Sequence, residues 1–328
     1  MALQRRNPTP VLSVVIPTFN AAGFLPRAID SALRNSPGIG DLEVIVVDDG
    51  STDATPTAVE RYRDRICYYA LPHCGLPGRV RNYGIERSHA DVVAFLDADD
   101  ECLPGRFDRQ LRLLKESGAD LVFCDSAMHD ENGNPRPTFL EKIGALSLVR
   151  QAIRDGSIED CFGLLIKTGN FINGGVMMIR RAALDRVGFF DPSIRIGEDF
   201  ELATRIAAEG RVAVDFTPGV LRREHGNNIS ADWRKRWPDS LALYQHFQAN
   251  PRVQSRPELR QSVRKKTAQV YRGMGSWHLG EGDSSSARQC WRRGMALDPL
   301  TASTAFWLMS FLPSGWLRRL QRWKTCKE

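Results

Sequence analysis

The sequence lacks any long hydrophobic run. No stretch of its 328 residues approaches the length of about eighteen apolar residues that a membrane-spanning helix needs. Its first ten residues, MALQRRNPTP, also lack the apolar core of a signal peptide. From these two absences we expect a cytoplasmic protein.

Cysteine pairs are absent as well. The seven cysteines are scattered and odd in number, and no two of them form a C-x-x-C pair. This pattern predicts reduced thiols, and it argues against both a disulfide framework and a zinc site.

Two enzyme classes are excluded by missing residues. Residues 17–24, PTFNAAGF, follow the first apolar run without the G-x-G-x-x-G of a dinucleotide-binding oxidoreductase. A phosphatase of the haloacid dehalogenase type also carries D-x-D after a strand, but it needs Thr or Val where this chain has Glu101.

Charge is unevenly distributed along the chain. Residues 231–328 carry 18 Lys and Arg against 7 Asp and Glu, whereas the remainder carries 27 against 32. We therefore expect an acidic domain over residues 1–230 and a basic region over residues 231–328 that associates with a membrane or a partner. The alternative is a helical domain whose basic residues are simply solvated.

The first hundred residues alternate between two patterns. Short apolar, β-branched runs occur at 11–16, 42–47, 66–70 and 91–96, and helical spacing of apolar residues separates them. Buried strands alternating with amphipathic helices predict an α/β fold with a mainly parallel sheet covered on both faces.

Polar residues follow three of these runs. They are Thr18 and Asn20, then Asp48 and Asp49, then Asp97, Asp99, Asp100 and Glu101 in the stretch AFLDADDECLP. Because parallel strands place their carboxyl ends on one rim, we expect the three clusters to form one site. Four carboxylates in five positions repel one another unless a cation or a proton compensates them.

The rest of the chain predicts further elements. Leu103, Phe107, Leu111 and Leu114 share one helical face, with Asp100 as a candidate N-cap. A strand and a helix are expected within 173–191, and another helix within 194–210. Residues 125–170 are the least patterned, with a turn or hairpin at DENGNPRP. The region after residue 231 is helical, and 271–300 resembles one helix–turn–helix unit of the tetratricopeptide type.

Six segments together resemble the family 2 glycosyltransferases. SVVIPTFN, VIVVDDGSTD, RNYGI, AFLDADD, GGVMMIRR and GEDFELATRIA occur in the order and spacing typical of that family, over roughly residues 10–230. The resemblance implies the GT-A fold and an inverting, nucleotide-sugar-dependent reaction.

The resemblance also implies the donor site. Asp99 is the metal-facing carboxylate for Mg²⁺ or Mn²⁺, Asp97 reaches the ribose or a metal-bound water, and His225 can face the diphosphate or the metal. Hard cations of this kind prefer oxygen ligands, so one or two carboxylates suffice.

Nucleotide recognition is implied for a second group of residues. Asp49 hydrogen-bonds the base, with Pro17, Thr18 and Asn20 beside it, and the alternative for Asp49 is an ordinary turn residue after a strand. Arg81 is the candidate for the diphosphate. Because the segment between Gly75 and Arg81 is one residue longer than the common pattern, Arg79 is the competing candidate.

The acceptor side is implied by GED. Asp199 is the general base on the acceptor hydroxyl and Glu198 accompanies it, while the alternative is that both merely favour the positive end of the helix dipole. The resemblance implies a metal-dependent hexosyltransferase with a nucleotide-sugar donor, a UDP-sugar first, and a glycan or lipid-linked acceptor in cell-surface polysaccharide or glycolipid synthesis.

Two further expectations complete the functional prediction. Q-x-x-R-W of the processive members is absent, which favours transfer of a single sugar. We expect no nucleic acid among the partners. Residues 305–324 mix Trp, Phe and Leu with Arg and Lys, so we expect peripheral contact with the inner face of the cell membrane. Packing of these aromatics onto the catalytic domain is the alternative for this tail.

The alternative function for the whole protein is a non-catalytic nucleotide-sugar or glycan-binding protein on the same scaffold.

Overall fold

The computed structural model describes residues 10–35, 42–130, 132–223 and 233–299, with side chains from 237 onward in the last range. The chain divides into two compact units, Met1–Ala231 and Asp232–Glu328. The predicted helical C-terminal region and the predicted α/β class are both confirmed.

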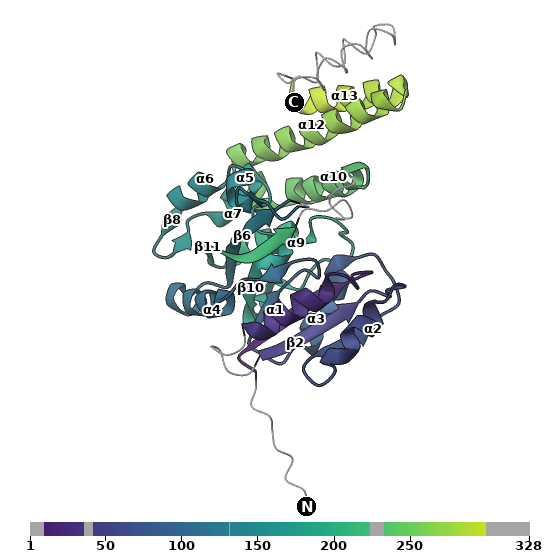
Figure 1. Ribbon diagram of the computed structural model, residues 1–328. Helices are drawn as coiled ribbons and strands as arrows, with labels where there is room; N and C mark the ends of the chain where they lie inside the picture. Colours follow the sequence, from purple (N-terminus) through teal and green to yellow (C-terminus); the bar gives the residue numbers. More distant parts are fainter. Residues whose placement is uncertain (1–9, 36–41, 131, 224–232, 300–328) are drawn as a thin grey trace, which may run out of the picture. The chain divides into compact units, whose positions relative to one another are not determined.

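The first unit contains a sheet of nine described strands in the order β3-β2-β1-β4-β10-β6-β11-β5, with β7 beside β6. Figure 1 labels β2, β6, β10 and β11 of this sheet. The strands are β1 (Leu12–Thr18), β2 (Leu42–Asp48), β3 (Cys67–Ala70), β4 (Val92–Phe95), β5 (Glu101–Cys102), β6 (Leu121–His129), β7 (Pro135–Arg136), β10 (Met177–Arg180) and β11 (Val212–Arg223). A separate hairpin pairs β8 (Ile153–Arg154) with β9 (Ser157–Ile158).

Most of the pairing is parallel. β1 pairs in parallel with β2 and β4, and β2 with β3, while β10 runs antiparallel between β4 and β6. Buried Val, Ile and Leu side chains fill β1, β2 and β4, as expected for strands covered on both faces.

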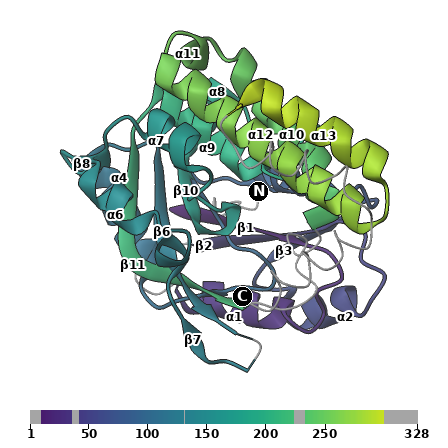
Figure 2. The same ribbon diagram turned by 90° about the horizontal axis from the view of Figure 1, so that it is seen from above.

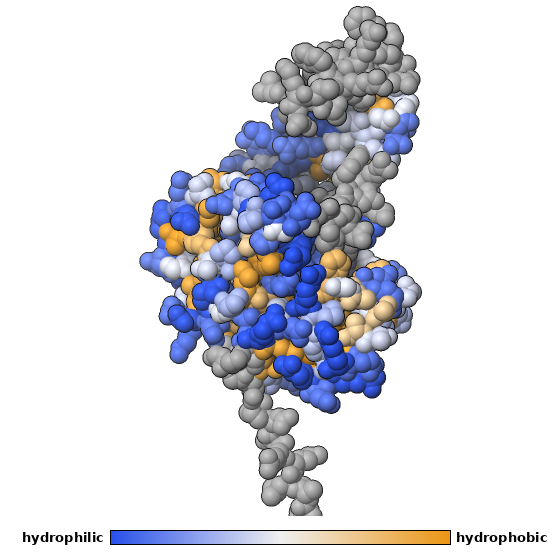
Figure 3. All heavy atoms as spheres, in the orientation of Figure 1, coloured by the Kyte–Doolittle hydropathy of each residue, from blue (hydrophilic) through white to orange (hydrophobic). Residues whose placement is uncertain are grey.

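The face of the molecule that Figure 3 shows is mostly hydrophilic, with small hydrophobic areas.

Helices cover both faces of this sheet. They are α1 (Leu25–Arg34), α2 (Thr55–Val59), α3 (Pro77–Arg87), α4 (Arg106–Ser117), α5 (Phe139–Lys142), α6 (Leu146–Gln151), α7 (Cys161–Thr168), α8 (Arg181–Val187) and α9 (Glu198–Glu209), with 3₁₀ turns η2 (Glu60–Tyr62) and η3 (Gly174–Val176). Figure 2 shows α1 and α2 on one side of the sheet and α8 and α9 on the other. α3 packs on β1 and β2, and α4 packs on β6 and β11.

Two local predictions need correction. The helix expected from Leu103 begins at Arg106, because Glu101 and Cys102 pair with β11 as strand β5 and Gly105 occupies the N-cap. Asp100 is therefore not the cap of this helix. The first strand continues through Pro17 to Thr18, and the β4 register ends at Val15, so the missing N–H of Pro17 costs no ladder bond on that side.

The second unit consists of described helices α10 (Trp233–Ala249), α11 (Pro251–Gln254), α12 (Pro257–Gly280) and α13 (Ser284–Leu297). α12 and α13 pack as a hairpin in which Trp291 is buried against Gly275. Asp283 caps α13 by accepting from the backbone N–H of Ser286 at 3.0 Å. In the described ranges, no helix is both long enough and apolar enough to cross a bilayer.

Candidate active site

The carboxyl ends of β1 and β2 lie side by side, with Thr18 opposite Asp48. Asp48 is satisfied within the fold, because its carboxylate accepts hydrogen bonds from Ser51 and from the Tyr68 hydroxyl at 2.6 Å. Thr18 is only 4% exposed. Asp49, the next residue after β2, is also buried, at 5% exposed, and takes its hydrogen-bond donors from another segment.

Asp49 is fixed by the segment before α3. Its Oδ1 accepts from the Cys74 N–H at 2.9 Å, its Oδ2 accepts from the Gly75 N–H at 2.8 Å, and His73 Nδ1 lies 3.0 Å from Oδ2. The His73 ring stacks on Phe19 with centroids 4.3 Å apart. A carboxylate held from one side retains lone pairs for a further donor such as a nucleobase N–H.

Asn20 and Pro17 surround this position. The Asn20 side-chain oxygen accepts from the backbone N–H groups of Thr52 at 2.8 Å and Asp53 at 3.3 Å. Its observed contacts therefore order the loop after β2. Pro17 lies in β1 and is partly buried.

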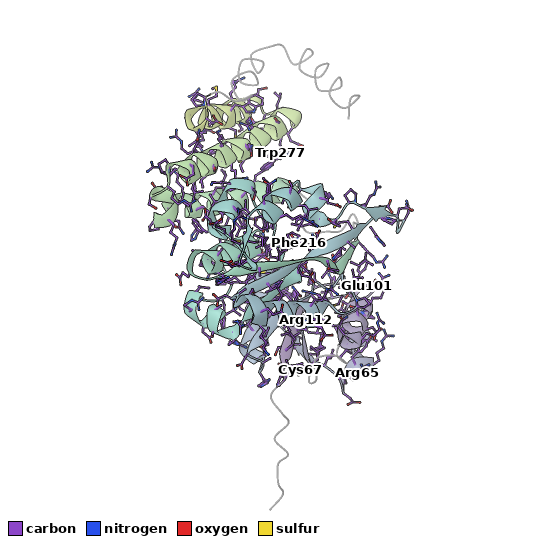
Figure 4. All side chains as sticks on the ribbon, turned by 90° about the vertical axis from the view of Figure 1, so that its left-hand side faces the viewer. Arg65, Cys67, Glu101, Arg112, Phe216 and Trp277 are labelled. Carbon is purple, nitrogen blue, oxygen red and sulfur yellow. The ribbon has the colours of Figure 1, made fainter. Side chains whose placement is uncertain are left out.

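The carboxylates of the acidic stretch after β4 lie next to arginines from α3 and β11. Asp97 pairs with Arg81 at 2.8 Å, Asp100 lies 3.7 Å from the Arg222 Nε, and Glu101 (labelled in Figure 4) pairs with the Arg223 Nη2 at 2.9 Å. Burial raises the pKa of Asp100 well above its ordinary value, although Arg222 opposes this.

Arg81 joins the acidic stretch to the first residue of α9. From α3 its Nη1 donates to Glu198 Oε1 at 2.6 Å and its Nη2 donates to Asp97 Oδ1 at 2.8 Å. Burial lowers the pKa of Arg81, but the carboxylates of Asp97, Glu198 and Asp199 outweigh it, so the pKa lies above its ordinary value. Arg81 is 6% exposed, whereas Arg79 is exposed.

Glu198 and Asp199 open α9 because Gly197 turns the chain. Gly197 has φ +91°, a conformation that favours glycine, and it is the N-cap of the helix. Asp199 Oδ1 accepts from Asn170 Nδ2 and its Oδ2 accepts from the Gly174 N–H, both at 3.0 Å. Two donors from outside the helix thus hold this carboxylate in a fixed orientation.

The pKa values of both carboxyls are raised, so both groups are weaker acids than usual. Burial raises the pKa of Glu198 to about 7, with the Asp199 charge adding to the effect and Arg81 opposing it. Burial also raises the pKa of Asp199, again against Arg81. A carboxylate with a raised pKa is a stronger base, as proton abstraction near neutral pH requires.

Sequence reasoning missed three residues of this cluster. Asn170 and Gly174 hold Asp199, and Gly175 packs so closely on Asp97 that a Cβ there would lie 2.8 Å from Oδ2. Asn170 belongs to the least patterned part of the chain and carries no local signal. The paired glycines of NGGVMM did signal a close backbone approach, although not what they approach.

The residues proposed for the metal are carboxylates at one strand end. Asp99 is partly exposed, and Asp97 is oriented by Arg81 and Gly175. Two carboxylates fit Mg²⁺ or Mn²⁺, which take further oxygens from water and substrate. Within the described residues, no group of three or more His, Cys, Asp and Glu is placed to hold a metal. His225 lies outside the described residues.

Comparison with solved structures supports this architecture. The chain superimposes on S. aureus TarS 1–349 in complex with UDP-GlcNAc with a TM-score of 0.63, over 92% of this chain and 89% of that one at 17% identity. Mannosyltransferase PcManGT from Pyrobaculum calidifontis, in complex with GDP-Man and Mn²⁺, gives a TM-score of 0.57 over 92% and 84% at 18% identity. These likenesses confirm the predicted GT-A fold.

Comparison with sequences then gives the family. Residues 13–188 match the model described as glycosyl transferase family 2, to which the chain therefore belongs. Succinoglycan biosynthesis protein ExoO of Rhizobium meliloti (strain 1021) is 32% identical over 67% of this chain and 63% of that protein. The chain spans just under two thirds of the length of the first curated relatives that it matches.

Proposed function

We propose that this protein is an inverting glycosyltransferase that moves one hexose from a nucleotide diphosphate sugar to an acceptor hydroxyl. One observation carries the proposal: a single buried guanidinium, that of Arg81, joins Asp97 of the D-x-D to Glu198, the neighbour of Asp199. The donor-binding and base-bearing segments therefore belong to one hydrogen-bonded cluster, as a displacement at a sugar carbon requires.

In this proposal the donor occupies the rim formed by β1, β2 and β4. Asp49 accepts from the nucleobase, with Thr18, Pro17 and Asn20 beside it, and Asp97 reaches the ribose. Asp99 and Asp97, with His225, would hold Mg²⁺ or Mn²⁺, which neutralises the charge that develops on the diphosphate leaving group. That PcManGT binds Mn²⁺ supports the choice of metal.

Asp199 takes the proton of the acceptor hydroxyl. The donors from Asn170 and Gly174, with the Phe200 N–H at 2.7 Å, hold its carboxylate in place, and Glu198 stays paired with Arg81. Attack by the deprotonated oxygen from the face opposite the diphosphate inverts the anomeric carbon. General-base assistance of this kind is worth about 10²- to 10⁴-fold in rate.

Arg81 was predicted to contact the diphosphate, and its two Nη groups are instead committed to carboxylates in this structure. We propose that Arg81 positions Asp97 and Glu198. Arg79 lies two residues earlier on α3, is exposed, and is the better candidate for the phosphates.

The acceptor and the setting are inferred from relatives. The printed role of ExoO in succinoglycan biosynthesis supports a glycan or lipid-linked acceptor in cell-surface polysaccharide synthesis. We place the reaction at the cytoplasmic face of the membrane. The UDP-GlcNAc bound to TarS makes a UDP-sugar the first donor to test, with GDP-mannose as the second.

A donor panel tests the proposal. UDP-GlcNAc, UDP-glucose, UDP-galactose and GDP-mannose are each incubated with the protein and Mn²⁺, and release of the nucleotide diphosphate is measured with and without acceptor extracts. We expect one donor to be consumed several-fold faster than the others. Binding of a donor without any turnover would instead identify a non-catalytic nucleotide-sugar-binding protein.

A further inference from the structure

Arg106 is an arginine with no exposed surface, in the first turn of α4. A buried guanidinium is costly unless hydrogen bonds satisfy it. Its Nη2 donates to the backbone oxygens of Phe95 at 3.0 Å and Gly175 at 2.9 Å, and its Nε donates to Gln110 Oε1 at 2.9 Å. One amino group is thus shared between two backbone segments that are 80 residues apart in the chain.

Both segments belong to the proposed site. Phe95 ends β4, two residues before Asp97. Gly175 follows Gly174, whose N–H donates to Asp199 at 3.0 Å, and Gly175 itself packs on the Asp97 carboxylate. The Arg106 Nη2 therefore fixes the strand end that presents Asp97 against the turn that holds Asp199.

Gln110, one helical turn later, keeps this guanidinium in place. It has no exposed surface, its Oε1 accepts from Arg106, and its Nε2 donates to the Val176 oxygen at 2.9 Å. Two side chains of α4 thus donate hydrogen bonds to backbone oxygens at the C-terminal end of β4 and in the η3 turn. A hydrophobic side chain at 106 would fill the same space at lower desolvation cost, but it could not set the spacing of two carbonyl oxygens.

We propose that Arg106 is a positioning residue for the transfer reaction, which sets the distance between Asp97 on the donor side and Asp199 on the acceptor side. This inference rests on the proposed role of Asp199 as the base. A misplacement of about 1 Å between reacting groups can cost on the order of 10²-fold in rate. Because Asp97 also contacts the donor in the proposed function, donor binding weakens as well, but by a smaller factor, since Asp49 follows β2 and keeps its place.

The test compares Arg106→Met with Arg109→Met. Arg109 lies on the same helix and pairs with Asp215 at 2.8 Å, but it contacts no residue assigned to the chemistry. We expect Arg106→Met to lower kcat on the order of 10²-fold and to change the donor KM and the UDP affinity by a clearly smaller factor, about tenfold at most. Arg109→Met should leave kcat within about threefold. Equal effects of the two variants, or a loss of UDP affinity that matches the loss of kcat, would overturn the inference.

A second readout does not depend on turnover. Hydrogen exchange at the Gly174 amide, followed by NMR, reports whether the turn stays bonded to Asp199. Exchange should accelerate by about tenfold or more in Arg106→Met and stay unchanged in Arg109→Met. Unchanged exchange in Arg106→Met would overturn the positioning role. If wild-type protein turns over no donor while Arg106→Met still accelerates this exchange, the proposed function fails and the structural coupling stands.

Gln110→Leu covers the case in which Arg106→Met does not fold. It retains the guanidinium but removes the group that orients it, so a smaller loss of kcat, about tenfold, is expected, with a smaller change in the donor KM. A folded Gln110→Leu with wild-type kcat and wild-type exchange at Gly174 would contradict the proposal.

Discussion

Arg81 and Glu198, separated by 117 positions in the sequence, form a buried ion pair with 2.6 Å between Nη1 and Oε1. The same guanidinium binds Asp97, so α3, the end of β4 and the start of α9 meet at one side chain. Because breaking one partner of a buried pair leaves a charge uncompensated, this contact ties the stability of the fold to the geometry of the site.

Asp199→Asn should lower kcat by two or more orders of magnitude, because the amide cannot take the acceptor proton. The affinity for UDP should change little, since a base acts in the transition state. Steady-state kinetics and calorimetric UDP binding measure both quantities, and NMR of the product should show an inverted anomeric centre. Glu209→Gln, at the other end of α9, is the control. A large loss of donor affinity with kcat preserved would remove Asp199 from this role.

Asp99→Asn should weaken UDP binding in the presence of Mn²⁺ and have little effect in its absence, because the carboxylate is a stronger oxygen ligand than the amide. Excess EDTA should abolish transfer by the wild type. Asp64→Asn, an exposed carboxylate of the same unit, serves as the control. Undiminished turnover in EDTA contradicts a metal requirement.

The pH dependence of kcat should reflect the raised pKa of Asp199. Asp199 must be ionised to act, and burial raises its pKa above the ordinary 3.8, so kcat should fall as the pH drops through a value higher than an exposed aspartate would give. Because burial raises the pKa of Glu198 to about 7, Glu198 is already protonated on the acid side of neutrality, where an aspartate loses its charge. Glu198→Gln should therefore leave the acid limb of kcat in place. Loss or movement of this limb in Glu198→Gln would assign the titrating base to Glu198 and contradict the role of Asp199.

Gly175→Ala should disturb Asp97 directly. The added Cβ would lie 2.8 Å from Asp97 Oδ2 and 3.2 Å from its backbone nitrogen, so the carboxylate must move. We expect a destabilisation of about 1–3 kcal/mol from overpacking and a loss of kcat of roughly tenfold or more. Gly23→Ala is the matched control, because no heavy atom lies within 4 Å of the added Cβ. Thermal unfolding measures the stability of both variants, and steady-state kinetics measures their kcat. Equal stability and equal kcat of the two variants would argue against crowding at Asp97.

Residues 305–324 lie outside the described residues, and their proposed membrane contact stays a prediction. Each basic residue near an anionic surface contributes about 1 kcal/mol, which salt weakens. The full chain should therefore co-sediment with phosphatidylserine vesicles at low salt and be released at high salt, whereas a chain ending at residue 300 should stay in solution. Equal binding by the two chains would remove the tail from this role.

The sequence by itself determined the strands, the polar clusters at their ends and the family. These features are local: the buried runs of β1, β2 and β4 show in consecutive residues, and the D-x-D and GED segments are contiguous. The rim on which Thr18, Asp48 and Asp97 lie followed from the rule that parallel strands end together. The start of α4 was misplaced, because β5 forms only where β11, more than 100 residues later, pairs with it.

Only the tertiary structure decided which groups meet. The antiparallel insertion of β10 between β4 and β6 brings Gly174 and Gly175 against Asp199 and Asp97, and no local pattern specifies that order of strands. The partners of Arg81 and the burial of Arg106 follow from the same arrangement. Charged residues in a sequence give their type but not their surroundings, and their acidity and their role depend on the burial and the partners that the assembled sheet supplies.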